Sequence, residues 1–301
     1  KFRRSARSAQ DGVRRTLTQC AEVKALIVRS HQEYQFKISV VLALTILAER
    51  NTELYSEVLQ YYLELQDPLD LNLYPLVQSL IEACGTEKAY SILNGTIYPT
   101  QRAWLFGFYY FLPQAEISIK RLNQLLELYK TSESRALPFD WDFLLNYRTI
   151  EPEIISKITE LLLIRAEDDA NYAHVGFNLF NPLTKVNEEI TDHFRGKTEL
   201  LKRAYFVELG STAHADHDGK TLNRILDLDT NFIVEYIDWM YGRSKWVSEH
   251  DDSRDYSFIW ERDDYYEIMV RGAERIFECE KEGSDYSHFK VFFGLQRNGQ
   301  E

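Results

Sequence analysis

Two histidines and two aspartates fall within five positions in the segment His214-Ala215-Asp216-His217-Asp218. Imidazole and carboxylate groups bind zinc and other divalent metals, so this segment carries the sharpest chemical signal in the chain. No second cluster with matching spacing completes a metal site. Aspartates just before a helix are also common caps, and the sequence favours Asp216 or Asp218 as the cap of a helix over 220–228. A metal-dependent helical hydrolase that uses this cluster remains an alternative.

Closely spaced carboxylates are the second feature that could support chemistry. The pairs are Asp227 with Asp229, Asp251 with Asp252, and Asp263 with Asp264. General acid–base catalysis requires two such groups in a cleft with separated pKa values. Solvated helix faces and caps explain most of these pairs, and Asp229 or Thr230 is expected to cap the helix that begins near Phe232. No glycine-rich phosphate-binding signature is present, and we assign no catalytic residue and no cofactor to this chain.

The segment from Phe232 to Tyr266 is rich in aromatic side chains interleaved with charged ones, and it contains three of the five tryptophans. Aromatic residues beside arginine anchor protein interfaces, because they bury a large area at a low cost in entropy. Most of them could equally fill the core between two long helices. The patch that we expect to bind a partner consists of Trp239, Tyr241, Trp246, Arg254 and Trp260, and Trp246 lies in a charged loop.

These residues must be positioned by helices, because apolar residues recur at helical spacing from end to end of the chain. Glycine and proline, which interrupt helices, number only 13 and 7 in 301 residues. The pattern predicts about a dozen helices and no strand. The helices are expected at 13–27, 34–48, 54–65, 71–83, 86–93, 100–112, 115–129, 140–147, 153–165, 170–180, 188–209, 222–228, 231–241 and 258–279.

The expected fold class is all-α, with an irregular α-solenoid of antiparallel helix pairs as the favoured architecture and a compact helical bundle as the alternative. Comparable helices recur without a strict period. We expect two helical-repeat halves, residues 1–135 and 136–301, which continue into one another and are truncated at one or both ends.

Charge is distributed unevenly along the chain. The net charge is −12, yet residues 1–50 carry 10 Lys and Arg against 4 Asp and Glu. The acidic remainder argues against nucleic acid as the main partner, although contact through the basic N-terminal segment is a further alternative. No apolar run reaches the roughly 20 residues of a membrane-spanning helix. Three widely separated cysteines, Cys20, Cys84 and Cys279, favour a reducing compartment, and the expected location is the cytoplasm.

Two C-terminal stretches, Ile225 to Tyr241 and Phe258 to Val270, resemble the helical-repeat regions that follow the motor in large bacterial NTPases of the STAND type, which include antiviral defence proteins. The resemblance covers about a fifth of the chain. It implies that these helices sense or bind a partner, while ATP hydrolysis takes place in another domain.

The sequence therefore favours a protein–protein recognition, scaffolding or sensor module of a larger protein, without catalytic activity in this chain. Its expected partner is another protein or another domain of the parent chain, with no membrane involved. The identity of that partner and the oligomeric state do not follow from the sequence.

Overall fold

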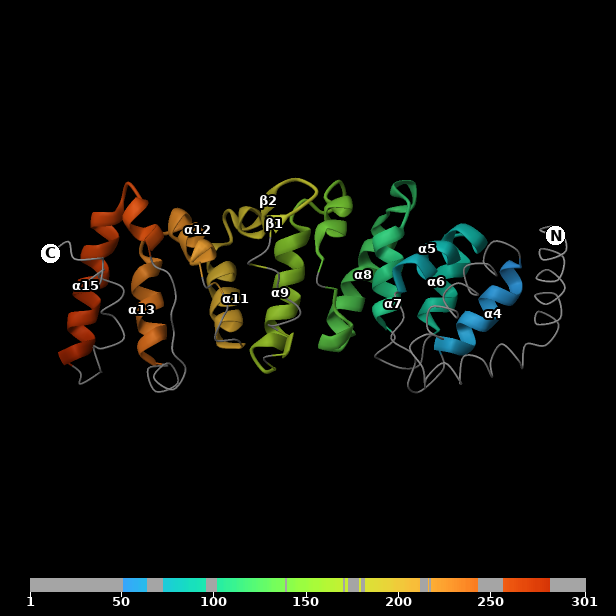
Figure 1. Cartoon of the computed structure of the whole chain (residues 1–301), viewed down its shortest axis with the longest axis horizontal. Coiled ribbons are helices and arrows are strands. Elements are labelled where there is room, and N and C mark those ends of the chain that lie inside the picture. The colour runs from blue at the N-terminus through green and yellow to red at the C-terminus, as the bar shows by residue number, and fades with distance from the viewer. Residues whose placement is uncertain are drawn as a thin grey trace, which may run out of the picture. The chain divides into compact units, whose positions relative to one another are not determined.

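The computed structural model describes residues 51–63, 73–95, 102–138, 140–169, 171–172, 182–211, 218–242 and 257–281, together with residues 179 and 216. Over these residues the chain is mostly helical, with two very short strands (Figure 1), so the all-α prediction is confirmed. None of the helices in this described part is both long enough and apolar enough to cross a membrane. The chain packs as two compact units, Lys1–Pro138 and Phe139–Glu301.

The first unit is built on a buried aromatic helix. Its elements among the described residues are α4 (Thr52–Leu63), α5 (Leu73–Cys84), α6 (Thr86–Asn94), α7 (Arg102–Phe111), η2 (Gln114–Glu116), α8 (Ile119–Thr131) and η3 (Ser134–Ala136). Helix α5 packs against α6 and α7, and α7 also contacts α6, α8 and η3. Every residue of α7 from Trp104 to Tyr109 is buried. The neighbouring helices thus give this dense aromatic run the cover that its apolar surface requires.

A buried arginine joins three helices of this unit. The Arg121 side chain on α8 is only 2% exposed, and its guanidinium lies 4.7 Å from the ring centroid of Tyr90 on α6 and 5.2 Å from that of Phe108 on α7. Its Nη2 donates a hydrogen bond to Glu87 at 2.7 Å, and its Nη1 donates to Gln124 at 3.0 Å. The carboxylate, the amide and the two aromatic faces replace the water that the cation loses on burial.

Three helix boundaries of the first unit follow from local chemistry. Asn51 caps α4, because its Oδ1 accepts the N–H of Leu54 at 3.1 Å. Gly85 separates α5 from α6 with φ 79° and ψ 165°, a positive φ whose extended ψ differs from that of a left-handed cap. The helix predicted over 115–129 begins later, at Ile119, because residues 114–116 form the separate turn η2 and Ser118 caps α8. The Ser118 side chain accepts the N–H of Arg121 at 3.4 Å.

The second unit is a run of helices in which neighbours in sequence are neighbours in space. Its elements among the described residues are η4 (Asp142–Tyr147), α9 (Ile154–Ala166), β1 (Pro182–Leu183), β2 (Glu188–Glu189), η5 (Ile190–Phe194), α11 (Thr198–Ser211), α12 (Lys220–Leu228), α13 (Phe232–Gly242), η6 (Ser257–Glu261) and α15 (Tyr265–Lys281). Helix α11 packs on α9 and α12, α12 contacts α13, and α13 packs on α15. Such local packing is typical of helical repeats. An irregular solenoid that runs through both halves stays a prediction.

The single helix predicted over 188–209 is wrong. The strands β1 and β2 pair antiparallel, Pro182 with Glu189 and Leu183 with Glu188, and η5 follows directly. A capping box at the start of η5 joins Glu189 and Asp192, and Gly196 with φ 81° turns the chain before α11 begins. Local capping and a positive φ therefore interrupt the apolar periodicity.

The single helix predicted over 258–279 is also interrupted. The chain forms η6, turns at Arg262 to Asp264, and resumes as α15 at Tyr265. The Arg262 side chain donates to Asp227 of α12 at 2.6 Å, to the Asn223 carbonyl at 3.1 Å, and to Asp264 at 2.7 Å. These contacts hold the turn against α12 and set the direction in which α15 leaves it.

Candidate interaction surface

The structure brings only part of the predicted partner-binding patch into view. Trp246, Arg254 and the side chain of Tyr241 lie outside the described residues. Trp239 lies on α13 and Trp260 on η6, and both are half-buried. The assembly of these five residues into one patch therefore stays a prediction.

Trp239 takes part in helix packing. Its ring stacks on Phe206 of α11, with the ring centroids 5.4 Å apart and the planes 14° from parallel. The ring centroid of Phe206 lies 5.1 Å from that of Phe232, and the ring centroid of Phe232 lies 5.9 Å from that of Tyr205. For Trp239, the interpretation as a packing residue between two helices is thus supported by direct contacts, since its ring joins α13 to α11.

The aspartates of the predicted metal cluster bind the start of α12. Asp216 accepts the N–H groups of Thr221 and Leu222, each at 2.9 Å, and the Tyr205 hydroxyl at 2.8 Å. Asp218 accepts the N–H of Lys220 at 3.3 Å and pairs with the Lys220 ammonium at 2.7 Å. The N-cap position itself is taken by Gly219, so the two aspartates satisfy the first N–H groups of α12 from positions just before the cap. His214 and His217, the other two candidate ligands, lie outside the described residues.

A second buried acid lies near this cap. Glu208 of α11 is buried, and burial together with the nearby Asp216 charge raises the pKa of its carboxyl well above the ordinary value. Burial also raises the pKa of Asp216, although its hydrogen bonds from Thr221, Leu222 and Tyr205 act in the opposite direction. Two acids that share a buried region cannot both ionise without repulsion, so the pair favours a bound proton.

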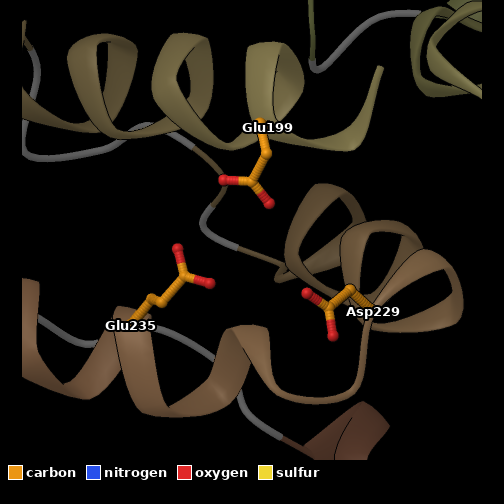
Figure 2. A group of neighbouring side chains, drawn as sticks. All are labelled: Glu199, Asp229 and Glu235. Atoms are coloured by element: carbon orange, nitrogen blue, oxygen red, sulfur yellow. The ribbon is translucent and has the colours of Figure 1, made fainter. Parts of the chain in front are cut away.

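Three carboxylates converge at the junction of α11, α12 and α13 (Figure 2). Glu199, Asp229 and Glu235 each offer an oxygen, and these oxygens lie within 4.8 Å of one another. The Lys202 ammonium lies among them, 2.9 Å from Glu199, 2.7 Å from Asp229 and 2.6 Å from Glu235. A metal ion at this place would have to displace that ammonium. The arrangement is therefore an ion cluster that ties three helices together.

The protonation state of this cluster follows from its contacts. The Lys202 side chain is only 4% exposed. Burial alone would lower the pKa of Lys202, but hydrogen bonds from its ammonium to the three carboxylates outweigh that cost and raise the pKa above its ordinary value. The hydrogen bond from the Lys202 ammonium also lowers the pKa of the Asp229 carboxyl. Both shifts favour the charged forms of Lys202 and Asp229 near neutral pH.

A groove of about 420 Å³ lies beside the turn that precedes α15. It is lined by Asn223, Asp227, Glu261, Arg262, Asp263 and Asp264. Arg262 is largely buried and binds Asp227 and Asp264, so two of the four carboxylates already have a cationic partner. The polar residues that line this groove are therefore accounted for, in part, by the ion pairs that hold the turn in place.

The strongest candidate for contact with another molecule is an apolar row on α15. Tyr266 is 76% exposed, Val270 is 38% exposed and Phe277 is 57% exposed. These positions follow the spacing i, i+4 and i+11, which places their side chains along one face of the helix. We call Tyr266, Val270 and Phe277 the α15 row.

The opposite side of α15 is occupied by α13 and the rest of the unit. Ile268, Gly272, Ile276 and Cys279 are buried, at a spacing that forms a second face of the same helix. On its flank, Arg275 pairs with Asp238 of α13. One face of α15 is therefore committed to the fold, while the α15 row is directed away from it.

Comparisons of this chain with protein-family models, curated proteins and solved structures found no match. The surface is therefore interpreted from its own chemistry.

The sequence interpretation missed the α15 row for an identifiable reason. The segment 258–279 was expected to form one long helix, and only Trp260 of this segment was placed in the partner-binding patch. The sequence did contain a signal, namely two separate apolar faces on one helix. At about 100° per residue, Tyr266, Val270 and Phe277 lie about 135° around the helix from Ile268 and Ile276. Two separate apolar faces on one helix predict two separate partners.

Proposed function

We propose that this chain is a protein–protein recognition module and that the α15 row is part of its contact surface. The observation that carries this proposal is the exposure of Tyr266 and Phe277 on one face of a helix whose other face is packed. Large exposed aromatic side chains cost free energy in water, and aligned exposed apolar residues mark interaction sites. Aromatic side chains are also enriched among the residues that dominate binding energy.

The predicted patch adjoins this row in sequence. Trp246, Arg254 and Trp260 precede α15, and we retain them as further partner-binding candidates on the basis of their residue types. The two alternatives gain no specific support from the described residues. Asp216 and Asp218 are engaged at the start of α12, and the basic residues 1–50 lie outside the described part of the chain.

We also propose that the module serves as the sensor or scaffold part of a larger bacterial protein of the STAND type, with a role in antiviral defence. This proposal rests on the resemblance of the two C-terminal stretches to helical-repeat regions of that class. The sequence of the intact gene product tests it directly. A motor domain that precedes Lys1 is the expected result, and a gene product without any NTPase domain would contradict it.

Partner capture tests the recognition proposal. Tyr266→Asp combined with Phe277→Asp places two charges on the α15 row and should abolish capture of a cellular protein, with the helical circular dichroism unchanged because both side chains are exposed. The matched control is Ile164→Asp on α9, since Ile164 is 66% exposed and lies on a different helix. A protein captured equally by the double variant and the control would contradict the proposed surface.

A further inference from the structure

A buried histidine and an arginine share one carboxylate oxygen in the second unit. The His193 side chain on η5 is only 7% exposed, and its Nε2 lies 3.1 Å from Oε2 of Glu188 on β2. Arg148, the residue that follows η4, places its Nη1 3.4 Å from the same oxygen. Arginine keeps its charge across the physiological pH range, whereas histidine gains or loses its charge near neutrality. The two side chains therefore compete as cations for Glu188 only when His193 is protonated.

Glu188 belongs to a ribbon that polar side chains tie to η4. We call residues 182–189, which form β1, β2 and the turn between them, the β1–β2 ribbon. One tie is the ion pair between Arg148 and Glu188. Another lies at the turn, where Asp142 of η4 accepts the N–H of Lys185 at 3.1 Å. The ribbon stands between α9 and α11 in the chain, so the strength of these ties affects the connection between the two helices.

A positive charge on His193 is costly in this position. Burial and the nearby Arg148 charge lower the pKa of the imidazole, and the carboxylates of Glu188 and Asp192 only partly oppose that effect. His193 is therefore mainly neutral near neutral pH, and Glu188 then has Arg148 as its cationic partner. A proton that binds at lower pH creates a buried cation, which needs an anionic partner. Glu188 is already within 3.1 Å of the imidazole.

The other elements packed against η5 contribute ion pairs of their own. These elements are α9, α11 and α12. The ion pairs are Arg224 of α12 with Glu189, Lys197 with Glu153 at the start of α9, and Lys202 of α11 with its three carboxylates. On η5 itself, Asp192 accepts the N–H of Glu189 at 3.1 Å. Among the described residues, Glu188 is thus the carboxylate that a charged His193 recruits at the least cost.

We propose that His193 is a pH-sensitive switch for the β1–β2 ribbon: the protonated imidazole takes Glu188 from Arg148 and so loosens the ribbon from η4. This inference is independent of the proposed recognition function. With the ribbon in place, His193 binds fewer protons than it does in an open state where the imidazole is in water. The closed arrangement therefore loses stability as the pH falls below about 6.5, the ordinary histidine pKa, until the folded pKa is passed.

An NMR titration of the whole chain tests the exchange of partners. The His193 ring signal is assigned by its loss in His193→Gln, and we expect its midpoint to lie below about pH 6.5. Arg148→Gln removes the charge that opposes protonation, so the midpoint should move upward by about 0.5 pH units or more. The matched control is Arg203→Gln, which breaks an exposed ion pair with Glu167 and should leave the midpoint unchanged.

Hydrogen exchange at the Lys185 amide tests the loosening, because this N–H spans the contact between the ribbon and η4. The rate in the wild type is divided by the rate in His193→Gln at the same pH, which cancels the intrinsic effect of pH on exchange. We expect a ratio near one above the His193 midpoint and a ratio above about three at about one pH unit below it. Arg148→Gln lacks the tie at every pH, so its Lys185 amide should exchange faster than that of the wild type already at neutral pH.

The two measurements can contradict the proposal separately. A midpoint at or above the ordinary histidine value, or one that Arg148→Gln does not move, overturns the exchange of partners. A Lys185 ratio that stays near one below the midpoint overturns the loosening. If circular dichroism shows that His193→Gln does not fold, Arg148→Gln becomes the reference. The wild-type rate at Lys185 should then approach the Arg148→Gln rate below the midpoint, and a difference that is constant with pH overturns the proposal.

Discussion

At the scale of single residues, the buried ionisable groups of the second unit connect stability to pH. Glu208 and Asp216 share a buried region near the start of α12, and the Lys202 ammonium is held by three carboxylates. The first arrangement favours a bound proton, and the second favours the charged forms of Lys202 and Asp229. The two should therefore respond to pH in opposite ways.

We expect Glu208→Gln to remove a loss of stability that develops as the pH rises. A raised pKa in the folded state means that the folded protein binds more protons than the unfolded chain. The wild-type free energy of unfolding should then fall as the pH rises above about 4.3, the ordinary glutamate pKa, until the folded pKa is passed. Glutamine resembles the protonated acid, so the variant should show a smaller fall, which comes from Asp216 and its raised pKa.

Urea unfolding at a series of pH values measures this difference. The exposed residue Glu160 on α9 supplies the control, because Glu160→Gln should leave the wild-type pH profile in place. Parallel profiles for wild type and Glu208→Gln would mean that Glu208 is ionised at little cost in the folded protein.

Lys202→Met should destabilise the protein by about 1–3 kcal/mol at neutral pH, because three carboxylates lose a shared charged donor. The pKa of Asp229 is lowered in the folded state, so this stabilisation is present above the ordinary aspartate pKa and is lost as the pH falls through the folded value. The difference between variant and wild type should therefore shrink below about pH 4. The control Lys120→Met removes an exposed ion pair and should change stability by less than about 0.5 kcal/mol.

At the scale of helices, the backbone at Gly85 decides how α5 passes into α6. A Cβ atom at this position would meet nothing within 4 Å, so the effect of a side chain is purely conformational. Gly85→Ala should reduce the free energy of unfolding by about 1–3 kcal/mol, since φ 79° with ψ 165° is a region that only glycine adopts readily. The exposed Lys88 on α6 is the control. Lys88→Ala should stay within about 0.5 kcal/mol of the wild type in chemical denaturation.

Local signals in the sequence predicted some of these elements and failed at others for physical reasons. The Asn51 cap, the positive φ of Gly85 and the aspartates that bind the start of α12 depend on residues within a few positions, and all three are present. The break before α15 depends on Arg262, whose partners on α12 lie more than thirty positions away. Periodicity reports that a segment is apolar and helical, but it does not contain such distant contacts.

The candidate surface illustrates the same limit. The sequence contains both apolar faces of α15, yet the choice of which one packs is made by α13 through Asp238 and the buried contacts of Ile268 and Ile276. Trp239 shows the converse, because its residue type suggested an interface and its stacking on Phe206 places it between two helices. Residue type therefore indicated a segment rich in aromatic side chains, and tertiary packing decided which apolar side chains are buried and which are exposed.

At the scale of the whole molecule, the chain combines two helical units with a net charge of −12 and an exposed aromatic row near the end of the second unit. In both units, the helices pack chiefly on others close in sequence. Arrays built in this way present side chains along their outer helices, and function resides in the surface that those side chains form. The central claim is that the α15 row is such a surface.

The most direct measurement of this claim is the ratio of partner captured by Tyr266→Asp/Phe277→Asp to partner captured by Ile164→Asp, determined by quantitative mass spectrometry on equally folded proteins. Loss of two exposed aromatic anchors should reduce binding by more than tenfold, so we predict a ratio below about 0.1 for the specific partner. A ratio near one for every captured protein would contradict the account.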